Sequence, residues 1–135
     1  MAKIRVTIDK QWDVAVYNFE GDVTFTDVRD AIIEYYNGPL TKYTFWDFSD
    51  TNVNKVSNAE LKQLGDLVSK LGSARKGCFD TVVVPGLLKY GMARIYAGYA
   101  ATLQKDKDAL KTLVFKNKDD AFGWIRSNSI SKGLG

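Results

Sequence analysis

The chain has 135 residues, 45% hydrophobic and 26% charged, which excludes the composition of a disordered protein and is enough for one packed domain. Its net charge of +3 arises from 19 basic and 16 acidic residues spread along the whole chain. Nucleic-acid binding, which needs clustered basic residues, is therefore not expected. No apolar run approaches the roughly 20 residues that cross a bilayer, so we expect no integral membrane association.

The N-terminus and the cysteine content favour a cytoplasmic protein. Charged residues alternate with apolar ones over the first nine positions, which is not the pattern of a signal peptide. Cys78 is the single cysteine, so no internal disulfide can form, as is usual in a reducing compartment. We interpret Cys78 as a small apolar residue entering a strand.

The first predicted element is a β-hairpin. Ile4, Val6 and Ile8 alternate with polar residues, and Val14 and Val16 continue this alternation after a polar break. A period of two residues is typical of strands with one buried face.

A helix is predicted to begin after Thr24. Thr24 suits the N-cap and Asp27 stands three residues later, the spacing of a capping box. Asn-Gly-Pro at 37–39 predicts the end of this helix, because Gly favours the C-terminal cap and Pro cannot continue the hydrogen bonds.

An aromatic-rich strand at 43–48 is predicted to lead into a loop at 49–52 and then into a second helix. Ser57 and Glu60 form the next capping-box pattern. The apolar stripe of this helix consists of Leu61, Leu64, Leu67, Val68 and Leu71.

The remaining elements alternate between strands and helices. Residues 79–84 and 111–115 are predicted strands, residues 87–103 a helix between them, and Asn117 the cap of a final helix. We expect one domain over residues 1–127 and a polar C-terminal tail over 128–135. The predicted fold class is α/β, with a mixed β-sheet in which an N-terminal antiparallel hairpin precedes a parallel βαβαβα succession, covered by about four helices.

Catalytic chemistry is poorly represented. The chain has no histidine, which excludes His-based triads and His-ligated zinc, and one Cys completes no metal site. Asp47 and Asp50 offer carboxylates to Mg²⁺, but turn residues at a strand end explain them more simply. We therefore predict no catalytic residue, no metal and no cofactor, and a protein that is not an enzyme.

Aromatic residues leave a second function open, a carrier or sensor for a small apolar ligand or lipid. Its pocket would be lined by Trp46, Tyr90, Arg94, Tyr96 and Trp124. The helix at 87–103 is also rich in small residues, which suit close packing either on the sheet or on a second copy in a homodimer.

Several stretches resemble the STAS-type domains of bacterial anti-sigma-factor antagonists, and most closely the divergent SpoIIAA-like (STAS-like) group. They are residues 18–24 before a helix, 44–49 leading into a capped helix, 85–96 and 114–124. The resemblance extends over about residues 4–125. It implies a STAS/SpoIIAA-like fold and a regulatory domain that binds a protein partner.

The resemblance also gives Ser57 a possible role as a switch. In the classical antagonists a serine within Asp-Ser-Ser-Gly, at the start of the helix after this strand, is phosphorylated by a partner kinase. The corresponding residues here are Lys55-Val56-Ser57-Asn58, so the serine is kept while its neighbouring Asp and Gly are missing. A plain helix cap also explains Ser57. The expected partner surface comprises the loop up to Ser57, with Asp50, Asn52 and Lys55, and the following helix, with Asn58.

Overall fold

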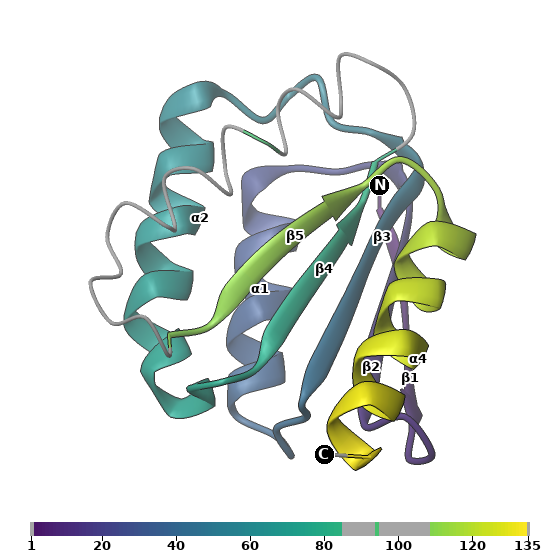
Figure 1. The fold of residues 1–135 in the computed structure, drawn as a ribbon. Helices are drawn as coiled ribbons and strands as arrows, with labels where there is room; N and C mark the ends of the chain where they lie inside the picture. The colour runs from purple at the N-terminus through teal and green to yellow at the C-terminus, as the bar shows by residue number, and fades with distance from the viewer. Residues whose placement is uncertain (1, 85–93, 95–108, 135) are drawn as a thin grey trace.

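The computed structural model describes residues 2–84, 94 and 109–134. Its single sheet has five strands, which lie side by side in the order of the chain (Figure 1). They are β1 (Lys3–Asp9), β2 (Val14–Asp22), β3 (Tyr43–Asn52), β4 (Phe79–Val83) and β5 (Lys111–Phe115). The described helices are α1 (Phe25–Tyr36), α2 (Asn58–Leu71), the 3₁₀ turn η1 (Gly72–Arg75) and α4 (Lys118–Leu134).

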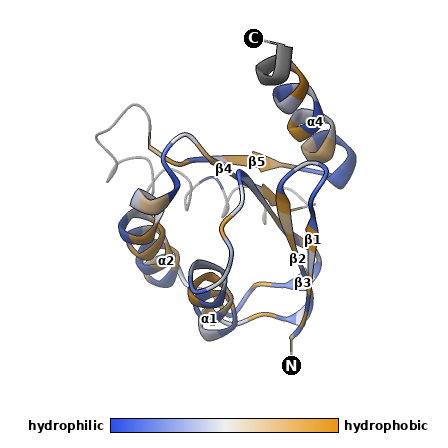
Figure 2. Cartoon of the chain, turned by 90° about the horizontal axis from the view of Figure 1, so that it is seen from below, coloured by the Kyte–Doolittle hydropathy of each residue, from blue (hydrophilic) through white to orange (hydrophobic). Residues whose placement is uncertain are grey.

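The sheet is mixed, as predicted: β1 pairs antiparallel with β2, and β2 to β5 are parallel neighbours. Right-handed crossovers that always step in the same direction put their helices on the same face of a sheet. Accordingly α1 and α2 lie together on one face and α4 covers the other (Figure 2). The helix expected at 87–103 lies outside the described residues except for Arg94, which is helical and exposed.

Successive side chains of β3 point to opposite faces of the sheet, so the hydrophobic core consists of two clusters. Trp46 points to the α1/α2 face, where it stacks on Tyr17 with ring centroids 4.5 Å apart. Phe45 points to the opposite face and meets Phe122 of α4 at 4.7 Å, beside the fully buried Ile125. Strands buried on both faces suit the centre of a parallel sheet.

The prediction of a loop at 49–52 is wrong, because β3 continues as a strand to Asn52. β2 extends to Asp22, and after a register shift between Asn18 and Glu20 it pairs with this segment. The Val23 amide then donates to the Asn52 carbonyl at 2.9 Å. Backbone partners from a distant strand therefore override the turn propensity of Ser, Asp and Asn.

The helix starts follow the sequence closely. Thr24 with Asp27 and Ser57 with Glu60 form complete capping boxes, and the Asn117 side chain accepts from the Asp120 amide at 2.8 Å. The last helix, however, continues to Leu134, so the segment from 128 that was expected to be a polar tail extends α4 instead.

The apolar side chains of β1 are more exposed than the sequence predicts. Ile4, Val6 and Ile8 are 41%, 44% and 47% exposed, although their alternation is that of a strand with one buried face. The reason is that β1 is the edge of the sheet and α1 lies over its neighbours. Among the described residues, no helix has both the length and the apolar character needed to span a membrane.

Candidate functional site

The candidate site lies where the parallel strands end. The carboxyl ends of β2, β3 and β4 meet at one edge of the sheet, which is the edge where open α/β sheets usually place their binding sites. From this edge the chain crosses a short loop and enters α2. We call the exposed residues here the Ser57 surface: Asp50, Asn52, Lys55, Ser57 and Asn58.

Ser57 is held in one conformation by its capping box. Its backbone is extended, with φ −83° and ψ 166°, and its Oγ accepts from the Glu60 amide at 3.1 Å. In return the Glu60 carboxylate accepts from the Ser57 amide at 2.9 Å. The side chain of Ser57 remains exposed, so the hydroxyl is both fixed and accessible.

The loop before Ser57 is stabilised by local hydrogen bonds and by one buried side chain. The Asn52 side chain accepts from the Asn54 amide at 3.0 Å, and the Val56 amide donates to the Val53 carbonyl at 3.0 Å. Val56 itself is 6% exposed and anchors the loop to the core below. The surrounding polar side chains are thus displayed on a fixed backbone.

Asp47 belongs to the framework of this edge and not to its surface. It is 3% exposed; one carboxylate oxygen accepts from the Ser49 amide at 2.9 Å, and the other meets Lys118 Nζ of α4 at 3.2 Å. The carboxylate does bond nearby backbone, but Asp47, Ser49 and Asp50 all lie within β3 and not in the turn that was expected at this strand end. Within the part of the chain that the structure describes, no group of His, Cys, Asp or Glu is arranged to hold a metal ion.

The charges around Ser57 matter for any modification there. Glu60 is bonded to the Ser57 backbone, and Lys55 is exposed two residues earlier. A phosphate on Ser57 would gain from the helix dipole and from free amides at the start of α2, but it would repel the Glu60 carboxylate. Phosphorylation would therefore exchange the neutral cap for a concentrated negative charge.

The predicted aromatic pocket is not assembled. Trp46 and Trp124 lie on opposite faces of the sheet, because Trp46 packs in the α1/α2 cluster and Trp124 contacts Tyr43 and Phe79 from α4. Arg94 is exposed, and Tyr90 and Tyr96 lie outside the described residues. The sheet itself separates the two tryptophans that were expected to share a pocket.

Trp46 does border a small apolar cavity between the sheet, α1 and α2. Its volume is about 90 Å³, well below the roughly 300 Å³ at which ligand pockets usually begin. Val56 and Leu61, which enclose the start of α2, line the same space. The described walls therefore resemble an imperfectly filled core more than a carrier site.

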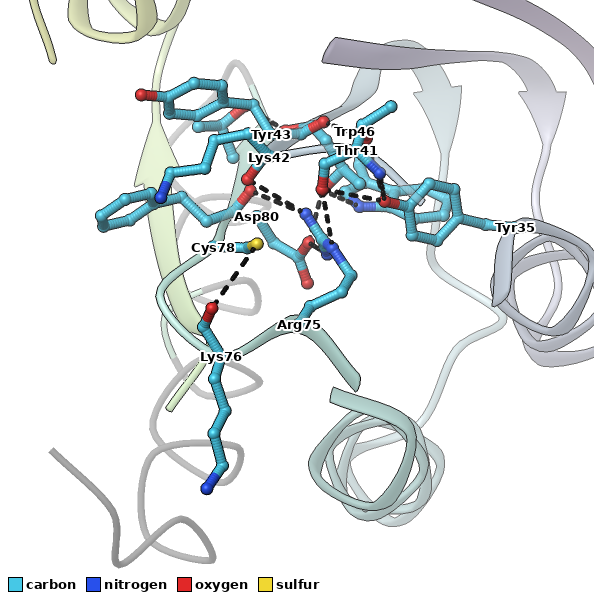
Figure 3. A network of polar contacts seen from close by, with 12 residues as sticks. Tyr35, Thr41, Lys42, Tyr43, Trp46, Arg75, Lys76, Cys78 and Asp80 are labelled. Carbon is cyan, nitrogen blue, oxygen red and sulfur yellow. Dashed lines mark hydrogen bonds and ion pairs between the residues drawn. The ribbon is translucent and has the colours of Figure 1, made fainter. Parts of the chain in front are cut away.

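An important polar group that the sequence analysis missed is Arg75. Arg75 is 2% exposed, and its guanidinium meets Asp80 Oδ1 at 2.5 Å (Figure 3). The same carboxylate oxygen accepts from the Thr44 hydroxyl. We call this pair, with the backbone it holds, the Arg75 clasp.

The Arg75 clasp ties together the amino ends of two strands. The guanidinium donates to the carbonyls of Thr41 at 3.1 Å, Lys42 at 3.4 Å and Phe79 at 3.3 Å, and lies 5.1 Å from the Tyr35 ring centroid. Burial alone lowers the pKa of Arg75, but Asp80 and Tyr35 raise it by more, so the guanidinium stays charged.

A local signal pointed to this pair. Asp80 stands inside a β-branched strand that was predicted to be buried, and a buried carboxylate needs a cation or several donors. Arg75 is five residues earlier in the sequence, close enough to be the partner of this carboxylate. The structure places Arg75 in the interior and leaves Arg94 exposed.

The Tyr36 hydroxyl borders the same cavity as Asp80 and predicts a loss of stability at high pH. Its oxygen is buried and forms no hydrogen bond of ordinary geometry with the described residues, although the Arg75 guanidinium lies close enough to interact with it. Burial, reinforced by Asp80 and only partly opposed by Arg75, raises the pKa of Tyr36 to about 12. Because the unfolded chain loses this proton near its ordinary value of 10.0, the free energy of unfolding should fall as pH rises from 10 to 12.

Tyr36→Phe should reduce this slope and cost little stability at neutral pH, since the buried hydroxyl that it removes forms no hydrogen bond of ordinary geometry. Urea unfolding at several pH values measures both effects. Tyr17→Phe serves as a comparison, because burial also raises the pKa of Tyr17 to about 12. An unchanged slope in Tyr36→Phe would contradict the assignment to Tyr36.

Comparisons with known proteins bear on the fold. No protein-family model and no curated protein matches the chain. Among solved structures, one similar chain is an uncharacterized protein of the DUF3478 family with a SpoIIAA-like fold from Shewanella loihica, with TM-score 0.55 and 15% identity, covering 92% of this chain and 93% of that one. Another is an anti-sigma factor antagonist from Mycobacterium paratuberculosis, with TM-score 0.56 and 16% identity, covering 93% and 95%. The fold of this chain is therefore SpoIIAA-like, as its sequence resemblance implied.

Proposed function

On the basis of this SpoIIAA-like fold, we propose that the chain is a cytoplasmic, non-enzymatic regulatory domain that binds a protein partner through the Ser57 surface. The observation that carries the proposal is the exposed, conformationally fixed hydroxyl of Ser57 at the start of α2. One of the similar solved structures is named an anti-sigma factor antagonist.

The physical setting suits a switchable contact. The start of α2 offers a positive helix dipole, and the five side chains of the Ser57 surface are polar and exposed. A phosphate on Ser57 adds about two negative charges at neutral pH, enough to turn an attractive contact into a repulsive one. Phosphorylation of Ser57 is thus the regulatory form of the proposal.

Binding is tested by affinity capture from a bacterial host lysate, with the full chain as bait. A specific partner should be retained by the unaltered chain and lost by Lys55→Glu combined with Asn58→Arg, since both changes lie on the exposed surface. Ser57→Asp should weaken capture. Asn117→Asp is the matched control, because it places the same charge at the cap of α4 on the other face of the sheet. Equal capture by all four chains would overturn the proposal.

Measuring the free energy of unfolding of the Ser57 variants separates an effect on partner binding from an effect on folding. Ser57→Ala should lower the free energy of unfolding by about 1 kcal/mol, because the first turn of α2 loses its side-chain acceptor. Ser57→Asp should retain most of that stability, since Asp is an equally good N-cap. Urea denaturation measures both. A Ser57→Asp protein that is stable but no longer binds assigns the lost binding to charge.

A further inference from the structure

β1 is an edge strand with an apolar face that is not covered by the described residues. Its neighbours in the β2 register, Phe19, Tyr17 and Ala15, belong to the core beneath α1. The apolar surface of this sheet face therefore extends beyond α1 onto the exposed side chains of Ile4, Val6 and Ile8. A long, exposed, apolar edge strand without proline is a template for pairing with another strand.

A groove borders this strand on the α1 side. Its volume is about 650 Å³, and its walls include Val6 and Ile8 of β1, Tyr17 of β2 and Ile33 of α1. Ile33 is 39% exposed, so the apolar surface extends from β1 onto the helix. Single exposed apolar residues are ordinary, but a continuous patch of them marks an interaction surface.

We propose that β1 pairs antiparallel with β1 of a second copy of this chain, across a two-fold axis at Val6. In this register Val6 faces Val6, Ile4 faces Ile8, and Lys3 faces Asp9 of the second copy. Apolar residues thus meet apolar residues, and two Lys–Asp pairs of opposite charge close the ends of the ladder. The strand is complementary to itself, as a two-fold interface requires.

Neighbouring registers are less favourable. A shift of one residue would place the apolar side chains of the two strands on opposite faces. A shift of two residues in one direction sets Arg5 against Arg5, a repulsive pair, and in the other direction leaves Lys3 outside the ladder. The register centred on Val6 pairs all seven residues of β1 and leaves no like charges opposite each other.

The resulting dimer has one continuous sheet with α1 of both copies on the same face. The axis stands perpendicular to the sheet and reverses the strand direction. The Ser57 surfaces of the two copies therefore point to opposite ends of the dimer, and both stay open. Dimerisation and partner binding through Ser57 are consequently independent, and each is tested separately.

Light scattering coupled to size-exclusion chromatography of the full chain tests the dimer. The unaltered chain should have the mass of two copies, and Val6→Lys should raise the dimer dissociation constant by about a hundredfold, because two lysines then face each other in place of two valines. Ile130→Lys, at a 54% exposed position on α4, is the matched control and should leave the mass unchanged. Circular dichroism verifies that each variant is folded.

A charge exchange tests the register. Lys3→Asp alone and Asp9→Lys alone each create two like-charged pairs and should weaken the dimer about tenfold. Mixing the two variants restores opposite charges at both ends, so a heterodimer should form. A monomeric unaltered chain, a dimer that persists in Val6→Lys, or a mixture that fails to associate would each overturn the proposal.

Discussion

Arg75→Met is expected to lower the free energy of unfolding by about 3–5 kcal/mol, because it leaves the buried Asp80 carboxylate without its cation. Asp80 is 5% exposed, and the Thr44 hydroxyl would be its remaining donor among the described residues. The backbone carbonyls of Thr41 and Phe79 would lose a donor as well. Urea denaturation followed by circular dichroism measures the effect.

Two further variants make this prediction specific. Arg29→Met removes the cation of an exposed pair with Asp30, whose side chains are 43% and 60% exposed, and should cost under about 1 kcal/mol. Combining Arg75→Met with Asp80→Leu should cost less than the two single changes together, because no charge is then left unpaired. Equal losses in Arg29→Met and Arg75→Met would contradict a buried clasp.

Ile125→Ala should destabilise the chain by about 2–5 kcal/mol, through lost burial and the cavity that remains. Ile125 is fully buried, and its helix α4 covers the sheet face formed by Val14, Tyr43, Phe45 and Val83. Closely packed cores relax only partly around a truncated side chain, so part of this cavity should persist. Thermal or urea unfolding measures the loss.

Ile130→Ala is the control for this variant. Ile130 lies five residues further along α4 but is 54% exposed, so the same truncation should change the free energy of unfolding by less than about 0.5 kcal/mol. Similar losses in both variants would show that helix propensity, and not burial at Ile125, governs the stability of α4.

The sequence revealed the features that depend on neighbours in the chain. Ser57 and Glu60 are three residues apart, so their capping box follows from spacing alone. The order of strands and helices predicted a mixed α/β sheet, and the family resemblance implied its SpoIIAA-like form. The end of β3 was misjudged because its pairing depends on a register shift in β2, far away in sequence. Local turn propensity contains no information about that partner.

The site was harder to predict for the same reason. Whether Trp46 and Trp124 meet depends on which face of the sheet the Trp46 side chain points to and on which face α4 covers. Neither can be read from one segment of the sequence alone. The Arg75 clasp likewise needs carbonyls from the start of β3, more than 30 residues away in the chain. The exposed face of β1 became evident only once the strand was placed at the edge.

The matching of sheet order to chain order has a consequence for synthesis on the ribosome. Each new strand finds its neighbour already made, so β1 to β3 can assemble with α1 while the rest of the chain is still being translated. Among the described elements, α4 covers the opposite face, and it follows all five strands in the chain. Until α4 has been synthesised, the side chains of Val14, Tyr43, Phe45 and Val83 lack this cover and can be bound by chaperones.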